Sequence, residues 1–134
     1  MDYSYKVIEH FMCPRNVGSM PDANAEGTYG DSNCGDFLDV YLKVEDGIIK
    51  KISYLVFGCA PAVASSSLMS VLAQSKTLEE ALKITDKDID QGLDGLPPNK
   101  LHCSVLGAKA LRNAIDNYLM SKQAEKNKEK EWKE

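Results

Sequence analysis

Apolar and polar residues alternate most clearly over residues 37–57, and this alternation predicts a β-hairpin. The first strand would bury every second residue, namely Leu38, Val40, Leu42 and Val44. Residues 45–47 read Glu-Asp-Gly, and an Asp-Gly pair favours a tight turn because both residues accept a positive φ at little cost. Residues 48–57 then form the return strand. The residues before Cys34 could add an edge strand.

The period changes to that of a helix on both sides of the hairpin. Residues 4–12 predict a short amphipathic helix capped by Ser4, with three apolar residues on one face: Val7, Ile8 and Phe11. Residues 15–30 are rich in Gly, Pro, Asn and Asp, which predicts an extended loop. After Gly58, small residues at helical spacing predict a helix over 59–75, with Pro61 in its first turn.

Three further helices complete the pattern. Thr77 and Thr85 each begin a short helix, because an acidic residue three positions later completes a capping box. The last helix follows Leu-Pro-Pro-Asn-Lys, and its predicted buried stripe is Val105, Leu106, Leu111, Ala114, Ile115, Tyr118 and Leu119. Together these elements predict an α+β fold: a small antiparallel sheet of about three strands, with helices on one face and a long C-terminal helix.

Length and charge refine this expectation. A chain of 134 residues suits a single domain, which we expect over 1–120 because 121–134 is charged and predicts a frayed helix end or a disordered tail. A net charge of −4 argues against nucleic acid as the main partner. No apolar run approaches the ~20 residues that span a bilayer, and the N-terminus does not resemble a secretory signal. We therefore expect a cytoplasmic protein that binds no membrane.

In the reducing cytoplasm expected for this protein, the four cysteines would rarely form disulfides. Metal or sulfur chemistry is therefore the favoured interpretation of these cysteines. Cys34 lies in a glycine-flanked loop before the hairpin, Cys59 lies at a strand-to-helix junction, and Cys103 begins the last helix. The sequence supplies an imidazole and a carboxylate nearby, from His102 and Asp36.

The positions of these cysteines at the ends of predicted elements favour a shared site. Side chains at the ends of elements can converge on one spot, and helix N-termini favour the thiolate form of Cys59 and Cys103. Any single cysteine could simply be a small core residue, which is our interpretation of Cys13. The chain has no Cys-x-x-Cys pair, so spacing alone is weak evidence for a zinc or ferredoxin-type site.

Four segments in order, YSYKVIEHFMCPRNVGSM, NCGD, FGCAPAVASSS and LPPNKLHCSVL, resemble the U-type iron–sulfur cluster assembly scaffolds, the IscU and NifU N-terminal family. The resemblance covers residues 3–119. It implies that Cys34, Cys59 and Cys103 bind the cluster, with His102 and Asp36 as the further candidate ligands.

The same resemblance implies a function. A cysteine desulfurase would deliver sulfur as a persulfide, with Cys103 as the acceptor. Iron and this sulfur would form a labile [2Fe–2S] cluster that passes to apo-proteins, and Asp36 would keep the cluster easy to release. Such a protein is an assembly scaffold without independent turnover. Zn²⁺ could occupy the same thiolate and imidazole site.

Two departures from the family pattern matter. Residues 96–100 read Leu-Pro-Pro-Asn-Lys where well-known members have valine in place of Asn99, so binding of an Hsp70-type chaperone to Leu96–Lys100 stays open. The alternative interpretation is that Pro97 and Pro98 only set up the last helix, with Asn99 as its cap. The second departure is Pro61, which a first helical turn tolerates.

Two other functions compete with the scaffold. A zinc-containing sulfurtransferase could use the same Asp-Cys-Cys-Cys set and carry persulfide away. A hydrolase built on His102 and Cys103 is the weaker rival, because adjacent residues rarely face each other as base and nucleophile.

Overall fold

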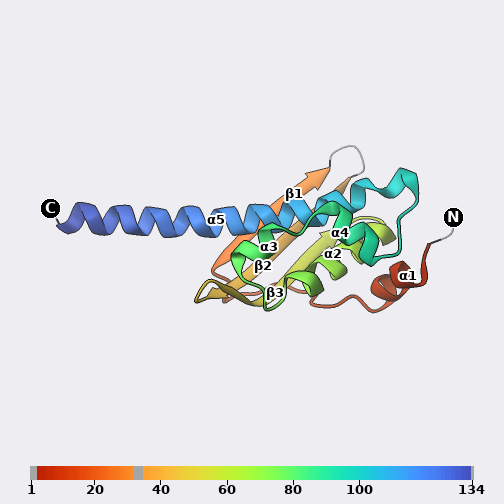
Figure 1. Ribbon diagram of the computed structural model, residues 1–134, viewed down its shortest axis with the longest axis horizontal. Helices are drawn as coiled ribbons and strands as arrows, with labels where there is room; N and C mark the ends of the chain where they lie inside the picture. Colours follow the sequence, from red (N-terminus) through yellow and green to blue (C-terminus); the bar gives the residue numbers. More distant parts are fainter. Residues whose placement is uncertain (1–2, 32–34, 134) are drawn as a thin grey trace.

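The computed structural model describes residues 3–31 and 35–133. Its elements in chain order are α1 (Tyr5–Met12), β1 (Ala25–Asp31), β2 (Asp36–Glu45), β3 (Ile48–Phe57), α2 (Ala60–Ala73), α3 (Leu78–Leu82), α4 (Asp86–Gly92), a 3₁₀ turn η1 (Pro98–Lys100) and α5 (His102–Lys133). The three strands form one antiparallel sheet in the order β1-β2-β3, and α5 crosses it as one long rod (Figure 1). The predicted α+β class, with a three-stranded sheet and a long C-terminal helix, is confirmed.

The hairpin is the best-predicted part of the fold. The apolar row of β2 is buried as expected, with Leu38, Val40 and Leu42 fully inaccessible. Asp46 and Gly47 form the two-residue turn, with φ of 55° and 73°. Both positive values are those of the turn that best matches the twist of a hairpin.

The loop predicted over 15–30 is wrong at its end, because β1 begins at Ala25 and pairs with β2 along its whole length. The strand shows no apolar alternation, since α5 lies directly on its inner face. A Cβ on Gly27 would lie 2.1 Å from the backbone nitrogen of Ala114. The amides of Asn113 and Asn117 also donate to the carbonyl oxygens of Thr28 and Glu26 on β1, at 2.7 and 2.8 Å. Small residues and edge carbonyls, not an apolar row, therefore define this strand.

α1 begins as predicted, with the Ser4 hydroxyl accepting from the Val7 amide at 3.1 Å. The predicted apolar face is wrong for two of its three residues, because Val7 is buried whereas Ile8 and Phe11 are 49% and 43% exposed. The helix packs against α2, and Val7 is the residue that it contributes to the core.

Polar contacts hold the N-terminal segment against α2. The Ser67 hydroxyl, which is buried, lies 2.7 Å from His10 Nδ1 and accepts from the Arg15 amide at 3.0 Å. Arg15 Nη1 lies 3.2 Å from the same His10 nitrogen. A guanidinium can only donate, so Nδ1 must be the acceptor and the His10 ring is neutral.

Acidification should therefore weaken the docking of α1. Burial lowers the pKa of His10, the Arg15 and Lys6 charges lower it further, and only Glu9 opposes them. When folding lowers the pKa of a histidine, its neutral form stabilises the folded state. This stabilisation is complete at a pH above the ordinary histidine pKa of about 6.5, and it is lost as the pH falls below that value. We expect the melting temperature to drop from pH 7.5 to 5.5, and to drop less in His10→Gln, whose amide oxygen can still accept. Equal drops in the two proteins would contradict this account.

The remaining helices follow their sequence signals. Thr77 and Thr85 cap α3 and α4, and both capping boxes are complete, with Glu80 and Asp88. α5 begins at His102, and Asn99 lies in η1, so the interpretation of Asn99 as the cap of the last helix is wrong.

α5 continues past the sheet. Leu119 is 45% exposed, so it does not belong to the buried stripe as predicted, and residues 121–128 are exposed along the helix. The domain boundary at residue 120 stays a prediction. Among the described residues, no helix combines the length and apolar character needed to cross a membrane.

Candidate functional site

Three elements meet at one end of the sheet and bring Asp36, Cys59 and Cys103 together. One ligand atom from each lies within 4.8 Å of the other two. Asp36 is the first residue of β2 and is in phase with the buried apolar row, so its carboxylate faces the helices and is only 5% exposed. Gly35 precedes it with φ of 72°, a conformation that favours glycine at this turn into the strand.

The two thiols come from the beginnings of two helices. Cys59 is the N-cap of α2, with an extended backbone, and Cys103 is the second residue of α5. Their sulfur atoms are 3.6 Å apart, and Asp36 Oδ2 lies 4.0 Å from Cys59 Sγ and 3.9 Å from Cys103 Sγ. Cys103 is fully buried, whereas Cys59 is partly exposed.

The protonation of Cys103 differs from the sequence-based expectation. Helix N-termini lower the pKa of a thiol, but burial raises the pKa of Cys103 well above its ordinary range, and Cys59 and Asp36 raise it further. Only Lys100 acts in the opposite direction. Desolvation therefore acts against the thiolate form that the helix N-terminus was expected to favour at Cys103. A bound cation would favour loss of the thiol proton.

Gly58 makes room for the carboxylate. A Cβ at this position would lie 2.5 Å from Asp36 Oδ1 and 2.9 Å from Ala62 Cβ. The missing side chain of Gly58 is therefore what gives the Asp36 carboxylate its place. The sequence indicates this orientation, because Asp36 and Leu38 are two residues apart and therefore lie on the same face of β2.

The other predicted residues fall as follows. His102 stands beside the group, with Nε2 3.6 Å from Cys103 Sγ. Cys34 lies outside the described residues, although its neighbour Gly35 leads directly into Asp36. Cys13 is exposed at the end of α1, so its interpretation as a core residue is wrong.

Two sulfur ligands, a carboxylate and an adjacent imidazole form a donor set for a thiophilic cation such as iron or zinc. The described residues supply three converging ligand atoms, and a tetrahedral site requires four. Two helices, α2 and α5, also begin at this spot, and the free amide groups at their N-termini carry partial positive charge.

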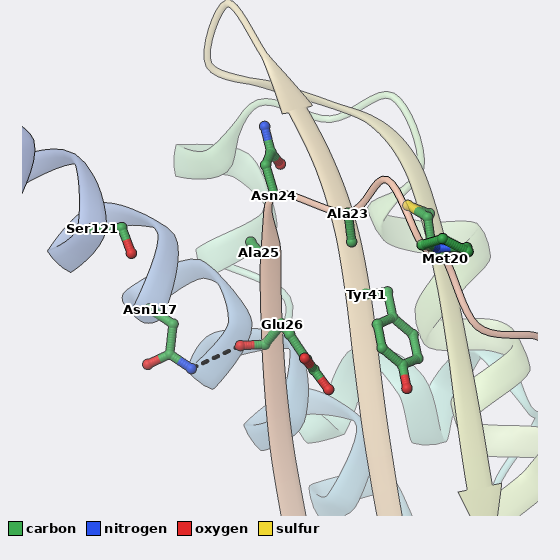
Figure 2. A pocket seen from close by; sticks show the side chains of 9 residues that line it. Met20, Ala23, Asn24, Ala25, Glu26, Tyr41, Asn117 and Ser121 are labelled. Atoms are coloured by element: carbon green, nitrogen blue, oxygen red, sulfur yellow. Dashed lines mark hydrogen bonds between the residues drawn. The ribbon is translucent and has the colours of Figure 1, made fainter.

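A hollow of about 430 Å³ lies farther along the sheet, where the segment before β1 meets α5. Its lining includes Met20, Glu26, Tyr41, Asn117 and Ser121 (Figure 2). Tyr41 is five residues beyond Asp36 on β2, which is roughly 17 Å of strand. Among the residues that the structure describes, no cysteine or histidine lines this hollow.

The chain is similar in sequence to known proteins. Residues 2–125 match the family model described as the NifU-like N terminal domain. The iron–sulfur cluster assembly scaffold protein IscU 1 of Archaeoglobus fulgidus is 51% identical over 116 residues, which is 87% of this chain and 76% of that protein. The scaffold protein IscU of Escherichia coli K12 is 43% identical over 129 residues, covering 92% and 99%.

A solved structure shows the same fold. The N-terminal NifU-like protein from Brucella abortus superposes with a TM-score of 0.74 at 20% identity, covering 87% of this chain and 93% of that one.

Proposed function

Because the chain belongs to the family of NifU-like N-terminal domains, we propose that it is a scaffold on which a [2Fe–2S] cluster is assembled and from which the cluster passes to apo-proteins. The observation that carries the proposal is the convergence of the Cys59 and Cys103 sulfurs with the Asp36 carboxylate within 4.8 Å. Relatives that are 51% and 43% identical are named as scaffolds for iron–sulfur cluster assembly, which supports it.

Each site residue has a proposed role. Cys34, Cys59 and Cys103 bind the cluster, and Asp36 or His102 supplies the fourth ligand. Three thiolates with one weaker oxygen or nitrogen ligand hold a cluster less firmly than the four thiolates of a durable electron carrier. An exchangeable fourth ligand suits a protein that must release its product.

The proposed partners follow from the chemistry. A cysteine desulfurase supplies sulfur as a persulfide on Cys103, iron arrives separately, and apo iron–sulfur proteins receive the product. The protein acts by binding and transfer, without turnover of its own. Free thiols in such a site require a reducing compartment such as the cytoplasm.

Binding of an Hsp70-type chaperone to Leu96–Lys100 stays an open prediction. Leu96 is 8% exposed and contributes to the core, whereas Pro98 and Asn99 are exposed on η1. A chaperone could therefore reach the turn but not the leucine that precedes it.

A zinc-containing sulfurtransferase is the second candidate, because the same thiols and carboxylate would also suit tetrahedral zinc. In that case the metal would stay bound while Cys103 carried sulfur away. The weaker hydrolase hypothesis gains nothing from the geometry, because Cys103 is fully buried and its pKa is raised.

Anaerobic reconstitution tests the proposal. When the protein is incubated with iron, cysteine and a cysteine desulfurase, a visible iron–sulfur chromophore should form. In the Asp36→Ala variant, a chelator should remove this chromophore several-fold more slowly than in the wild type. Asp39→Ala is the matched control, since Asp39 lies three residues along β2 and accepts from the Tyr41 hydroxyl on the opposite face.

The outcomes separate the candidates. Bound zinc with sulfur transfer and no chromophore would favour the sulfurtransferase. If both variants release the chromophore at the wild-type rate, the proposed role of Asp36 is refuted, but the scaffold proposal is not.

A further inference from the structure

We propose that Cys59 is the resolving thiol of the site: it attacks the inner sulfur of a persulfide on Cys103, forms a Cys59–Cys103 disulfide and expels the outer sulfur as hydrosulfide. The inference rests on the proposed role of Cys103 as the persulfide acceptor. It adds to that role a source for the two electrons that turn delivered sulfur into sulfide.

The positions of the two sulfurs carry the proposal. Cys59 Sγ lies 3.6 Å from Cys103 Sγ, close to the separation from which reacting atoms attack. Thiol–disulfide exchange proceeds by this kind of direct approach of one sulfur to another. In a disulfide the two sulfurs would be about 2.05 Å apart.

Burial favours a thiol that already lies inside the site. Cys103 is fully buried, so the neighbouring thiol of Cys59 is better placed to reach its Sγ than a thiol from solvent. Cys59 is partly exposed, touches that sulfur from within the site, and makes no side-chain capping bond to α2 that would hold its sulfur elsewhere.

The step balances within the site. The Cys59 sulfur forms a bond to Cys103 Sγ, and the bond between Cys103 Sγ and the outer sulfur breaks. The two cysteine sulfurs are oxidised together by two electrons, and the outer sulfur is reduced to sulfide. The proton of the Cys59 thiol ends on the departing hydrosulfide, and Asp36 Oδ2, 4.0 Å from Cys59 Sγ, lies where it can pass that proton on.

The disulfide must then be opened by a dithiol reductant, which returns two electrons and two protons. Until this happens, neither cysteine can bind metal, because only the thiolate is a ligand. Sulfide release and recovery of the ligands are therefore separate steps.

The test uses the full-length, metal-free protein under anaerobic conditions. Inorganic polysulfide adds sulfur, gel filtration removes the reagent, and mass spectrometry and a sulfide assay follow the protein with time. In the wild type, the added sulfur on Cys103 should disappear as a Cys59–Cys103 disulfide and an equal amount of sulfide appear. In Cys59→Ser the persulfide should persist, with sulfide release slower by roughly 100-fold or more.

A matched variant makes the assignment specific. Cys13→Ser should behave as the wild type, because it keeps the proposed attacking thiol and Cys13 is exposed at the end of α1. A wild type that keeps its persulfide as long as Cys59→Ser, or a Cys13→Ser protein that stalls equally, would overturn the inference and leave the acceptor role intact. If Cys103 gains no sulfur even in Cys59→Ser, the acceptor role fails and the inference fails with it.

Discussion

Replacing Gly27 by alanine is expected to lower the free energy of unfolding by about 3 kcal/mol or more, or to prevent folding. The added Cβ would lie 2.1 Å from the Ala114 backbone nitrogen and 2.6 Å from its Cα. Backbone atoms cannot rotate away as a side chain can, so α5 would have to lift from β1. Urea unfolding followed by circular dichroism measures the effect.

Gly30→Ala is the matched control on the same strand. There the nearest atom is Phe37 Cδ2 at 3.3 Å, the end of a side chain that can move. We expect a change of about 1 kcal/mol or less. Similar stabilities for the two variants would show that α5 does not rest on β1 as described.

Replacing Cys103 by alanine is expected to weaken zinc binding by more than about 100-fold, since changing even a group that only supports a ligand costs about 10- to 100-fold. Cys103 Sγ is the atom closest to the rest of the group, 3.6 Å from Cys59 Sγ and 3.9 Å from Asp36 Oδ2. Competition against a coloured chelator measures the affinity, and thermal unfolding of the metal-free protein checks that the variant folds.

Cys13→Ala provides the comparison, because this cysteine is exposed at the end of α1. Its zinc affinity should equal that of the wild type. If instead the Cys103 variant retained full affinity, the converging group would not be the metal site.

The hairpin and the capped helices were predictable because their signals are local. Alternation in β2, Asp46-Gly47 at the turn, and the capping boxes of α3 and α4 each act within a few residues. The edge strand predicted before Cys34 is confirmed as β1. Its bounds were not predictable, because its inner positions are small to admit α5, an element almost 90 residues away in sequence. The exposure of Ile8 and Phe11 was missed for a similar reason, since α1 is held by polar contacts to Ser67.

The sequence predicted which residues gather at the site, but not the protonation of Cys103 or the packing around Asp36. Thiols at element ends, with Asp36 and His102 nearby, gave the right neighbourhood from sequence. The burial that raises the pKa of Cys103, and the space that Gly58 leaves for Asp36, depend on how three distant segments pack. No pattern along the chain encodes those distances.

The buried carboxylate of Asp36 has a thermodynamic consequence. Its surroundings include two thiols, which are weak donors, and a carboxylate so placed opposes folding. A cation bound there would relieve that opposition, so loading and native-state stability must rise together. If the protein passes its cargo on as proposed, a recipient must bind that cargo more tightly than this site does, and release would return the protein to its less stable form.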